Sequence, residues 1–157
     1  MQVKEIIKKD VVKVKRSVSL KNLLILFKDF HTFPLVPVVD EKDILVGIVS
    51  LQNVIDAFQP HKAGPFRTIA FLERDEADMF DLEILSEVGS LILVDDFMER
   101  GYISVEEDSS LEHAYHLMKL HSLDFLPVID RAGKLEGMIG VFDLILMLFR
   151  QKGVLTV

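Results

Sequence analysis

The sequence of 157 residues contains no cysteine and no tryptophan, and its charge balance is acidic. Without cysteine, the chain has no disulfide, no thiol nucleophile, no thiolate zinc site and no Cys-bound iron–sulfur cluster. The 18 Lys and Arg against 25 Asp and Glu give a formal net charge of −7, and basic residues do not form a run. A protein that tracks nucleic-acid phosphates needs a basic face, so we expect no nucleic-acid partner.

Long uncharged segments are also missing. The longest one, residues 44–55, has 12 residues, whereas a membrane-spanning helix needs about 20. The first residues, 1–9, are interrupted by charges at Lys4, Glu5, Lys8 and Lys9 and lack the apolar stretch of a secretory signal. We therefore expect a cytoplasmic protein without a membrane partner, whose 50% hydrophobic residues belong to a core or a subunit interface.

An internal repeat fixes the architecture. The segments 37–40 (Pro-Val-Val-Asp) and 45–49 (Leu-x-Gly-Ile-Val) return as 127–130 (Pro-Val-Ile-Asp) and 135–139 (Leu-x-Gly-Met-Ile), at an offset of 90 residues. Farther upstream the offset is 91 residues, so that Val14 and Leu20 match Val105 and Leu111.

Each copy is predicted to form a strand, a helix, two strands and a second helix, which makes the fold class mixed α/β. β-favouring runs predict the first strands at 11–14 and 102–105. Apolar residues at helical spacing follow Leu20 and Leu111, and the spacing of Ser109 and Glu112 predicts a helix that starts at Ser109. Apolar strands on both sides of the polar turns 40–43 and 130–134 come next, before closing helices at 51–58 and 141–150.

We divide the chain into a first repeat at 1–58, an intervening segment at 59–90 and a second repeat at 91–157. The intervening segment has seven acidic residues between 73 and 87. These carboxylates could form a cation site or a docking face for a basic partner. We favour a third interpretation, in which they form the solvated face of a helix. A cation site of the EF-hand type is disfavoured because the segment lacks the glycine that such a loop needs.

The last predicted helix is apolar from 141 to 149 on every side except at Asp143. A helix that is apolar all round is buried. We expect it to pack against the other repeat, and it is also a candidate for a homodimer interface, since symmetric dimers are the commonest assemblies.

The segments 94–98, 103–111, 126–130 and 135–143 together resemble a CBS domain, and the first copy has the same landmarks in a less similar form. The two copies resemble a tandem CBS pair, or Bateman module, over nearly the whole chain except the intervening segment. The resemblance implies two β-α-β-β-α units packed as a pseudo-two-fold pair, as a stand-alone regulatory protein. It also implies an adenosine-containing ligand in the cleft between the repeats: AMP, ADP, ATP, S-adenosylmethionine or NAD.

The family's ligand signature is Gly-h-h-Thr/Ser-x-x-Asp, where the last strand meets the last helix. A carboxylate accepts hydrogen bonds from a ribose diol, and a hydroxyl near a helix N-terminus helps to place a phosphate. The second copy keeps Asp143 but has Gly140 in place of the hydroxyl. The first copy keeps Ser50 but has Asn53 in place of the carboxylate.

The same resemblance implies that Pro37 and Pro127 border the adenine, and that Val12 and Ile103 give main-chain contacts from the first strands. Roles without a ligand stay open for each of these residues. Asp143 and Ser50 are also suited to cap a helix, the prolines to fix turns at a strand edge, and Val12 and Ile103 to fill the core. Candidates for neutralising a phosphate are Lys15, Arg16, His31, Lys119, His121 and Arg131.

The sequence has none of the common catalytic motifs, whether HExxH, Gly-x-Ser-x-Gly, a P-loop or Gly-x-Gly-x-x-Gly. His113 and His116 share a predicted helix face, and we interpret them as surface residues, not metal ligands. We therefore expect no enzyme, no catalytic residue, no bound metal and no required cofactor. Two functions remain: a sensor of an adenosine-containing ligand, and a dimerising scaffold with degenerate nucleotide sites that binds an unidentified effector protein.

Overall fold

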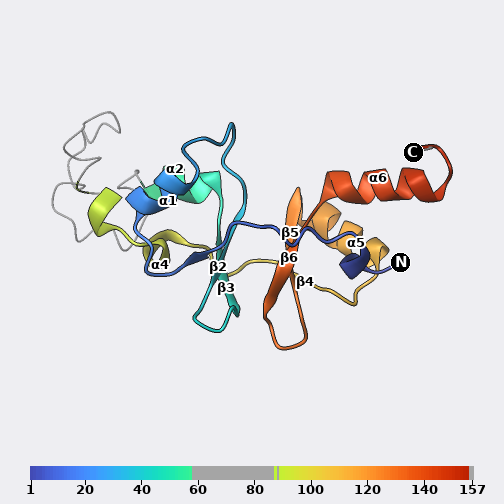
Figure 1. Ribbon diagram of the computed structural model, residues 1–157, viewed down its shortest axis with the longest axis horizontal. Coiled ribbons are helices and arrows are strands. Elements are labelled where there is room, and N and C mark those ends of the chain that lie inside the picture. Colours follow the sequence, from blue (N-terminus) through green and yellow to red (C-terminus); the bar gives the residue numbers. More distant parts are fainter. Residues whose placement is uncertain (58–86, 88, 156–157) are drawn as a thin grey trace. The chain divides into compact units, whose positions relative to one another are not determined.

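The computed structural model describes residues 1–57, 87 and 89–155 (Figure 1). The acidic intervening segment, with the solvated helix face predicted for it, lies almost entirely outside the described residues. The described elements, in chain order, are η1 (Val3–Glu5), β1 (Val14–Lys15), α1 (Leu20–Leu26), β2 (Val36–Val39), β3 (Leu45–Val49), α2 (Leu51–Ala57), α4 (Val94–Phe97), β4 (Val105–Glu106), α5 (Leu111–His121), β5 (Phe125–Ile129), β6 (Leu135–Gly140) and α6 (Val141–Gln151).

The chain forms two compact units. Unit 1 consists of Met1–Val12, Glu41–Leu45 and Gly101–Val157, and unit 2 consists of Lys13–Asp40 and Val46–Arg100. The predicted sequence repeats are confirmed as two sheets of three strands, in the orders β1-β2-β3 and β4-β5-β6. Both predicted closing helices are present, as α2 and α6.

Unit 2 is built around the buried strand β2, on which α1 packs. β1 pairs with β2 in parallel, with Val14 opposite Val38. The hydroxyl of Ser19 accepts a hydrogen bond from the Asn22 amide (3.1 Å) and so caps α1. Leu20 and Leu23 of α1 then point into the core, whose largest fully buried members also include Val36 and Val38. Leu24, Ile25 and Leu26 of the same helix are exposed.

Unit 1 repeats this arrangement with a longer helix. β4 pairs with β5 in parallel and β5 pairs with β6 antiparallel. Leu111, Ala114 and Met118 of α5 are buried at helical spacing. They form the core together with residues of β4, β5, β6 and α6: Val105, Leu126, Val128, Ile139 and Leu144.

The prediction that α5 starts at Ser109 is wrong by one residue. The cap is Ser110, whose hydroxyl accepts a hydrogen bond from the His113 amide (3.1 Å). Ser109 lies in the preceding turn, where its amide donates to the Glu106 carbonyl and its carbonyl accepts from the Val3 amide. The two adjacent serines have the same side chain, and both could cap the helix. The hydrogen bond from the Val3 amide holds Ser109 in the preceding turn, and Ser110 is the residue that caps α5.

The first strand of each repeat is also later than predicted. β1 starts at Val14 and β4 at Val105, so Val12 and Ile103 precede these strands and do not lie on them. The β-favouring residues continue upstream, but pairing with the neighbouring strand begins only at Val14 and Val105.

The N-terminal segment 1–12 belongs to unit 1, beside the second sequence repeat (Figure 1, dark blue). Val3 is completely buried, and its amide donates to the Ser109 carbonyl (2.9 Å). Farther along, the amides and carbonyls of Lys8 and Met138 exchange two hydrogen bonds of 2.9 and 3.0 Å. The repeats of the sequence and the compact units of the structure are therefore different divisions of the chain.

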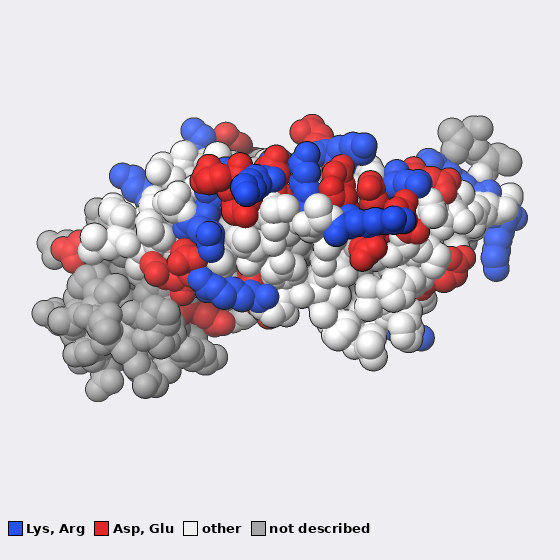
Figure 2. Space-filling model, turned by 90° about the horizontal axis from the view of Figure 1, so that it is seen from below, with Lys and Arg blue, Asp and Glu red and all other residues white. Residues whose placement is uncertain are grey.

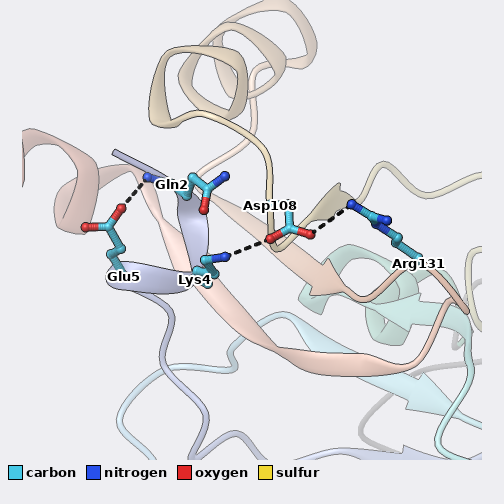
Figure 3. Close-up of polar contacts among 5 residues, drawn as sticks. All are labelled: Gln2, Lys4, Glu5, Asp108 and Arg131. Atoms are coloured by element: carbon cyan, nitrogen blue, oxygen red, sulfur yellow. Dashed lines mark hydrogen bonds and ion pairs between the residues drawn. The ribbon is translucent and has the colours of Figure 1, made fainter.

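Polar contacts hold the start of this segment (Figure 3). The Lys4 ammonium lies 2.9 Å from Asp108 Oδ1, and Arg131 lies 3.7 Å from Oδ2 of the same carboxylate. The hydrogen bond with Lys4 and the charge of its ammonium lower the pKa of Asp108, and the same pair raises the pKa of Lys4. In the adjoining turn, the backbone amide of Gln2 donates a hydrogen bond to Glu5 Oε1 (2.7 Å).

Pro37 and Pro127 lie in the middle strands of the two sheets, β2 and β5, and both are buried. A proline in a middle strand normally costs a ladder hydrogen bond. Here β4 pairs only with Val128 and Ile129, and β1 pairs only with the equivalent Val38 and Val39. Each proline therefore stands just before the parallel pairing begins, at a point where its strand is locally an edge.

Candidate functional site

The candidate site of unit 1 lies where β6 ends and α6 begins. Gly140 is the last residue of β6 and the residue that precedes the first turn of α6. Asp143, in that turn, accepts a hydrogen bond from the Gly140 amide through Oδ2 (3.2 Å). Its Oδ1 lies 3.0 Å from the Lys8 ammonium. The Asp143 side chain is 18% exposed and that of Lys8 is 69% exposed, so the carboxylate is mostly covered and its cation is mostly in solvent.

The equivalent corner of unit 2 has the same geometry with different residues. The Ser50 amide donates to Asn53 Oδ1 (2.8 Å), as the Gly140 amide donates to Asp143. The Ser50 hydroxyl donates to the same oxygen (2.9 Å) and accepts a hydrogen bond from the backbone amide of Asn53 (3.2 Å). Ser50 and Asn53 therefore cap α2 reciprocally. The predicted capping role is observed for Ser50, and both Asn53 and Asp143 fill the complementary position three residues on.

A second chain segment crosses each corner at a glycine. A Cβ at Gly137 would lie 2.3 Å from the Lys8 carbonyl oxygen, and a Cβ at Gly47 would lie 2.7 Å from the Met98 sulfur. In unit 2 the Glu99 and Ile48 backbones exchange hydrogen bonds of 2.8 and 3.0 Å, as Lys8 and Met138 do in unit 1. Glu99 is therefore the structural equivalent of Lys8.

An aromatic ring completes the corner of unit 1. The Phe125 ring lies so close to Gly140 that a Cβ there would be 3.2 Å from it. Phe125 is 49% exposed, and the flat face of such a ring is a surface on which a nucleobase can stack. Together, the corner offers a carboxylate, a cation and an exposed ring.

The structure groups the predicted site residues unequally. Asp143, Gly140, Pro127 and Ile103 all belong to unit 1, and Ser50, Asn53 and Pro37 belong to unit 2. Val12 was predicted to join the second group, but it belongs to unit 1. It is also 42% exposed, so the alternative role as a core residue is wrong, whereas Ile103 packs against the core of unit 1. Ligand roles for these residues, and the cleft between the repeats, stay predictions.

Lys8 and Phe125 belong to the corner of unit 1 but are not among the residues predicted from the sequence. Three of the predicted candidates for phosphate neutralisation, Lys15, Lys119 and Arg131, lie beside other groups. The Lys15 ammonium donates to the Asp40 carbonyl (2.7 Å), and Arg131 pairs with Asp108. Lys119 borders a cavity of about 330 Å³, whose lining includes Val141 but neither Gly140 nor Asp143. The signal that could have found Lys8 is the repeat itself, because the upstream offset of 91 aligns Lys8 with Glu99.

Acidic and basic side chains are interspersed on the face in Figure 2, without a continuous basic surface among the residues described there. Within 1–57, 87 and 89–155, no group of three or more His, Asp or Glu residues is placed to hold a metal ion. The helices of the same described ranges are too short, or not apolar enough, to cross a lipid bilayer.

The chain matches one protein family and is similar in fold to several solved structures. The sequence pattern of the CBS domain matches residues 3–60 and 94–150. CBSX2 in complex with AMP has a similar fold, with 24% identity, a TM-score of 0.70 and coverage of 96% of this chain and 98% of that one. The CBS domain pair of protein MJ0100, in complex with 5′-methylthioadenosine and S-adenosyl-L-methionine, has 20% identity, a TM-score of 0.63 and coverage of 97% and 98%.

A curated relative matches over a shorter segment. Homoserine O-acetyltransferase from Methanosarcina acetivorans is 42% identical over 55 residues, which are 35% of this chain. The matched segment is 10% of that enzyme. The similarity therefore covers about a third of this chain and does not extend to the bulk of the enzyme.

Proposed function

Because the chain belongs to the CBS domain family, with two matched copies, we propose that it is a regulatory module that binds an adenosine-containing ligand. The candidates are AMP, ADP, ATP, S-adenosylmethionine and NAD. In this proposal the protein is not an enzyme and requires no cofactor, since the nucleotide acts as a regulatory ligand. The similar folds of CBSX2 with AMP and of MJ0100 with two adenosine derivatives support this proposal.

The single observation that carries the proposal is the placement of Asp143. Its carboxylate is held at the first turn of α6 by the Gly140 amide and is mostly covered by neighbouring groups. Carboxylate oxygens have about four lone-pair sites between them, so Asp143 can accept from a ribose diol and keep its cap. The Phe125 ring beside Gly140 gives the base an apolar surface.

The test is a thermal-shift series on the purified protein with the five ligands, after bound nucleotide has been removed. A ligand at 100 times its Kd stabilises the folded state by about 2.7 kcal/mol. For a chain of this size, that corresponds to a rise in Tm of about 5–10 °C. A rise with one ligand identifies the signal. If none of the five raises the Tm of the folded protein, the adenosine-sensor proposal is wrong.

The alternative function is a dimerising scaffold with degenerate nucleotide sites. The observation that favours it is the exposed apolar surface of α6. Phe142, Ile145 and Phe149 are 67%, 39% and 46% exposed and follow one another at helical spacing. A stripe of this kind is costly to leave in water and suits a second copy of the chain. We propose that α6 forms a homodimer interface, which is compatible with the sensor function, and that an effector protein binds elsewhere.

The dimer proposal predicts that Phe142→Glu combined with Phe149→Glu halves the molecular mass measured by light scattering at micromolar concentration. Two buried carboxylates in each copy would oppose one another across the interface. Arg150→Glu is the control, because it changes the charge of the same helix at an exposed residue outside the stripe. A wild-type monomer, or an unchanged dimer in the double variant, would contradict the proposal.

A further inference from the structure

The two candidate corners differ in charge at matching positions. In unit 1 the carboxylate of Asp143 faces the ammonium of Lys8, and their charges cancel. In unit 2 the neutral Asn53 takes the place of Asp143, and Glu99 takes the place of Lys8. The matched pair of unit 1, Asp143 and Lys8, is thus balanced and includes a cation, whereas the matched pair of unit 2, Asn53 and Glu99, has a net negative charge.

The match between Lys8 and Glu99 rests on backbone geometry. The Lys8 amide and carbonyl bond to Met138, and those of Glu99 bond to Ile48. Met138 and Ile48 are themselves equivalent in the repeat, each one residue after a glycine that the crossing segment approaches closely. Both backbones are fixed, so the two side chains start from equivalent points at their corners.

The Lys8 ammonium is suited to change partners. Its side chain is 69% exposed, and an ion pair in that environment is weak. When a ribose diol bonds to Asp143, its hydroxyls compete with the ammonium for Oδ1. Lysine carries a compact charge on a flexible four-carbon stem, so the ammonium can then turn to an anionic group of the same ligand. A phosphate is such a group, and its hydrogen bonds to an ammonium are stronger than bonds between neutral groups.

We propose that Lys8 selects a phosphate-bearing nucleoside at the corner of unit 1, and that Glu99 excludes one from the corner of unit 2. This inference rests on the proposed function and adds the charge preference of each corner. Glu99 would place a carboxylate where the first corner offers an ammonium, and like charges repel at close range. AMP should therefore bind once per chain.

Titration calorimetry of the full chain with AMP and with adenosine tests the proposal. We expect one AMP per chain in the wild type. Lys8→Met should weaken AMP binding about tenfold and change adenosine binding by less than about twofold, because the phosphate contact alone is lost. Lys8→Glu, which copies the corner of unit 2, should weaken AMP binding further. Lys9→Met is the matched control, since it removes the same charge from the next, exposed residue and should leave both affinities unchanged.

The outcomes separate the two proposals. If the wild type binds both ligands and Lys8→Met keeps their affinity ratio, Lys8 does not select the phosphate and the inference is overturned while the adenosine site stands. Two equivalent AMP sites per chain would overturn the role of Glu99. If the folded wild type binds neither ligand, the phosphate preference is overturned, and the ligand series above decides whether the adenosine proposal goes with it.

Discussion

Asp143→Ala is expected to reduce the ligand-induced rise in Tm from about 5–10 °C to about 1 °C. The diol would lose its hydrogen bonds to a charged acceptor, which weakens binding about 100-fold. At the same ligand concentration, the remaining stabilisation is about 0.4 kcal/mol. Thermal shifts of variant and wild type, at equal concentrations of the ligand found in the series, measure the difference.

The loss of the cap must be separated from the loss of the ligand contact. Asp143→Ala also removes the acceptor for the Gly140 amide and the partner of Lys8, which should cost about 1 kcal/mol of stability without ligand. Asp143→Asn is the matched control, because Asn53 caps α2 in the same way. It should keep the Tm of the free protein near that of the wild type and still bind more weakly. A full ligand shift in both variants would rule out Asp143 as the ribose acceptor.

Gly137→Ala is expected to lower the free energy of unfolding by about 3 kcal/mol, at the upper end of the usual cost of overpacking. The added Cβ would lie 2.3 Å from the Lys8 carbonyl oxygen, which is a backbone atom held by its own hydrogen bonds. The segment around Lys8 must then move away from β6. Both of its hydrogen bonds to Met138 would be strained or broken, and the ion pair with Asp143 would be lost as well.

Gly47→Ala is the matched control for this change. Its Cβ would meet the sulfur of Met98 at 2.7 Å, and that side chain is flexible, although the Glu99 carbonyl oxygen follows at 3.1 Å. We therefore expect a cost of only about 1 kcal/mol at Gly47. Urea denaturation of the two variants gives both values. Equal losses of stability would show that the crossing segment of unit 1 yields as easily as the methionine does.

The sequence was sufficient to predict most elements because their signals are local. The strands around Val38 and Val128 are short apolar runs bounded by polar turns, and the helices keep their buried residues at helical spacing. The choice of partner for residues 1–12 has no local signal. Val3 and its apolar neighbours would suit the core of either repeat, and only tertiary contact assigns them to unit 1.

The candidate site was predicted in part for the same reason. Gly140 and Asp143 are three residues apart, so a local motif includes both. Lys8 is far from them in sequence, within a charged segment in which nothing distinguishes it from Lys9. The alignment of the two repeats pairs it with Glu99. The difference in charge between these two residues indicates a difference in ligand binding only once both are known to border a site.

The assignment of residues 1–12 to unit 1 also constrains the order in which the chain folds during synthesis. Unit 2 has its whole sequence once residue 100 has been made, and it can fold as a block. Val3 and Lys8 must wait for Ser109 and Met138, because these partners are synthesised about a hundred or more residues later. Bringing residues 1–12 to their partners beyond residue 100 closes a long loop, and the entropy of loop closure is lost before stabilising contacts form. We therefore expect unit 1 to fold more slowly than unit 2.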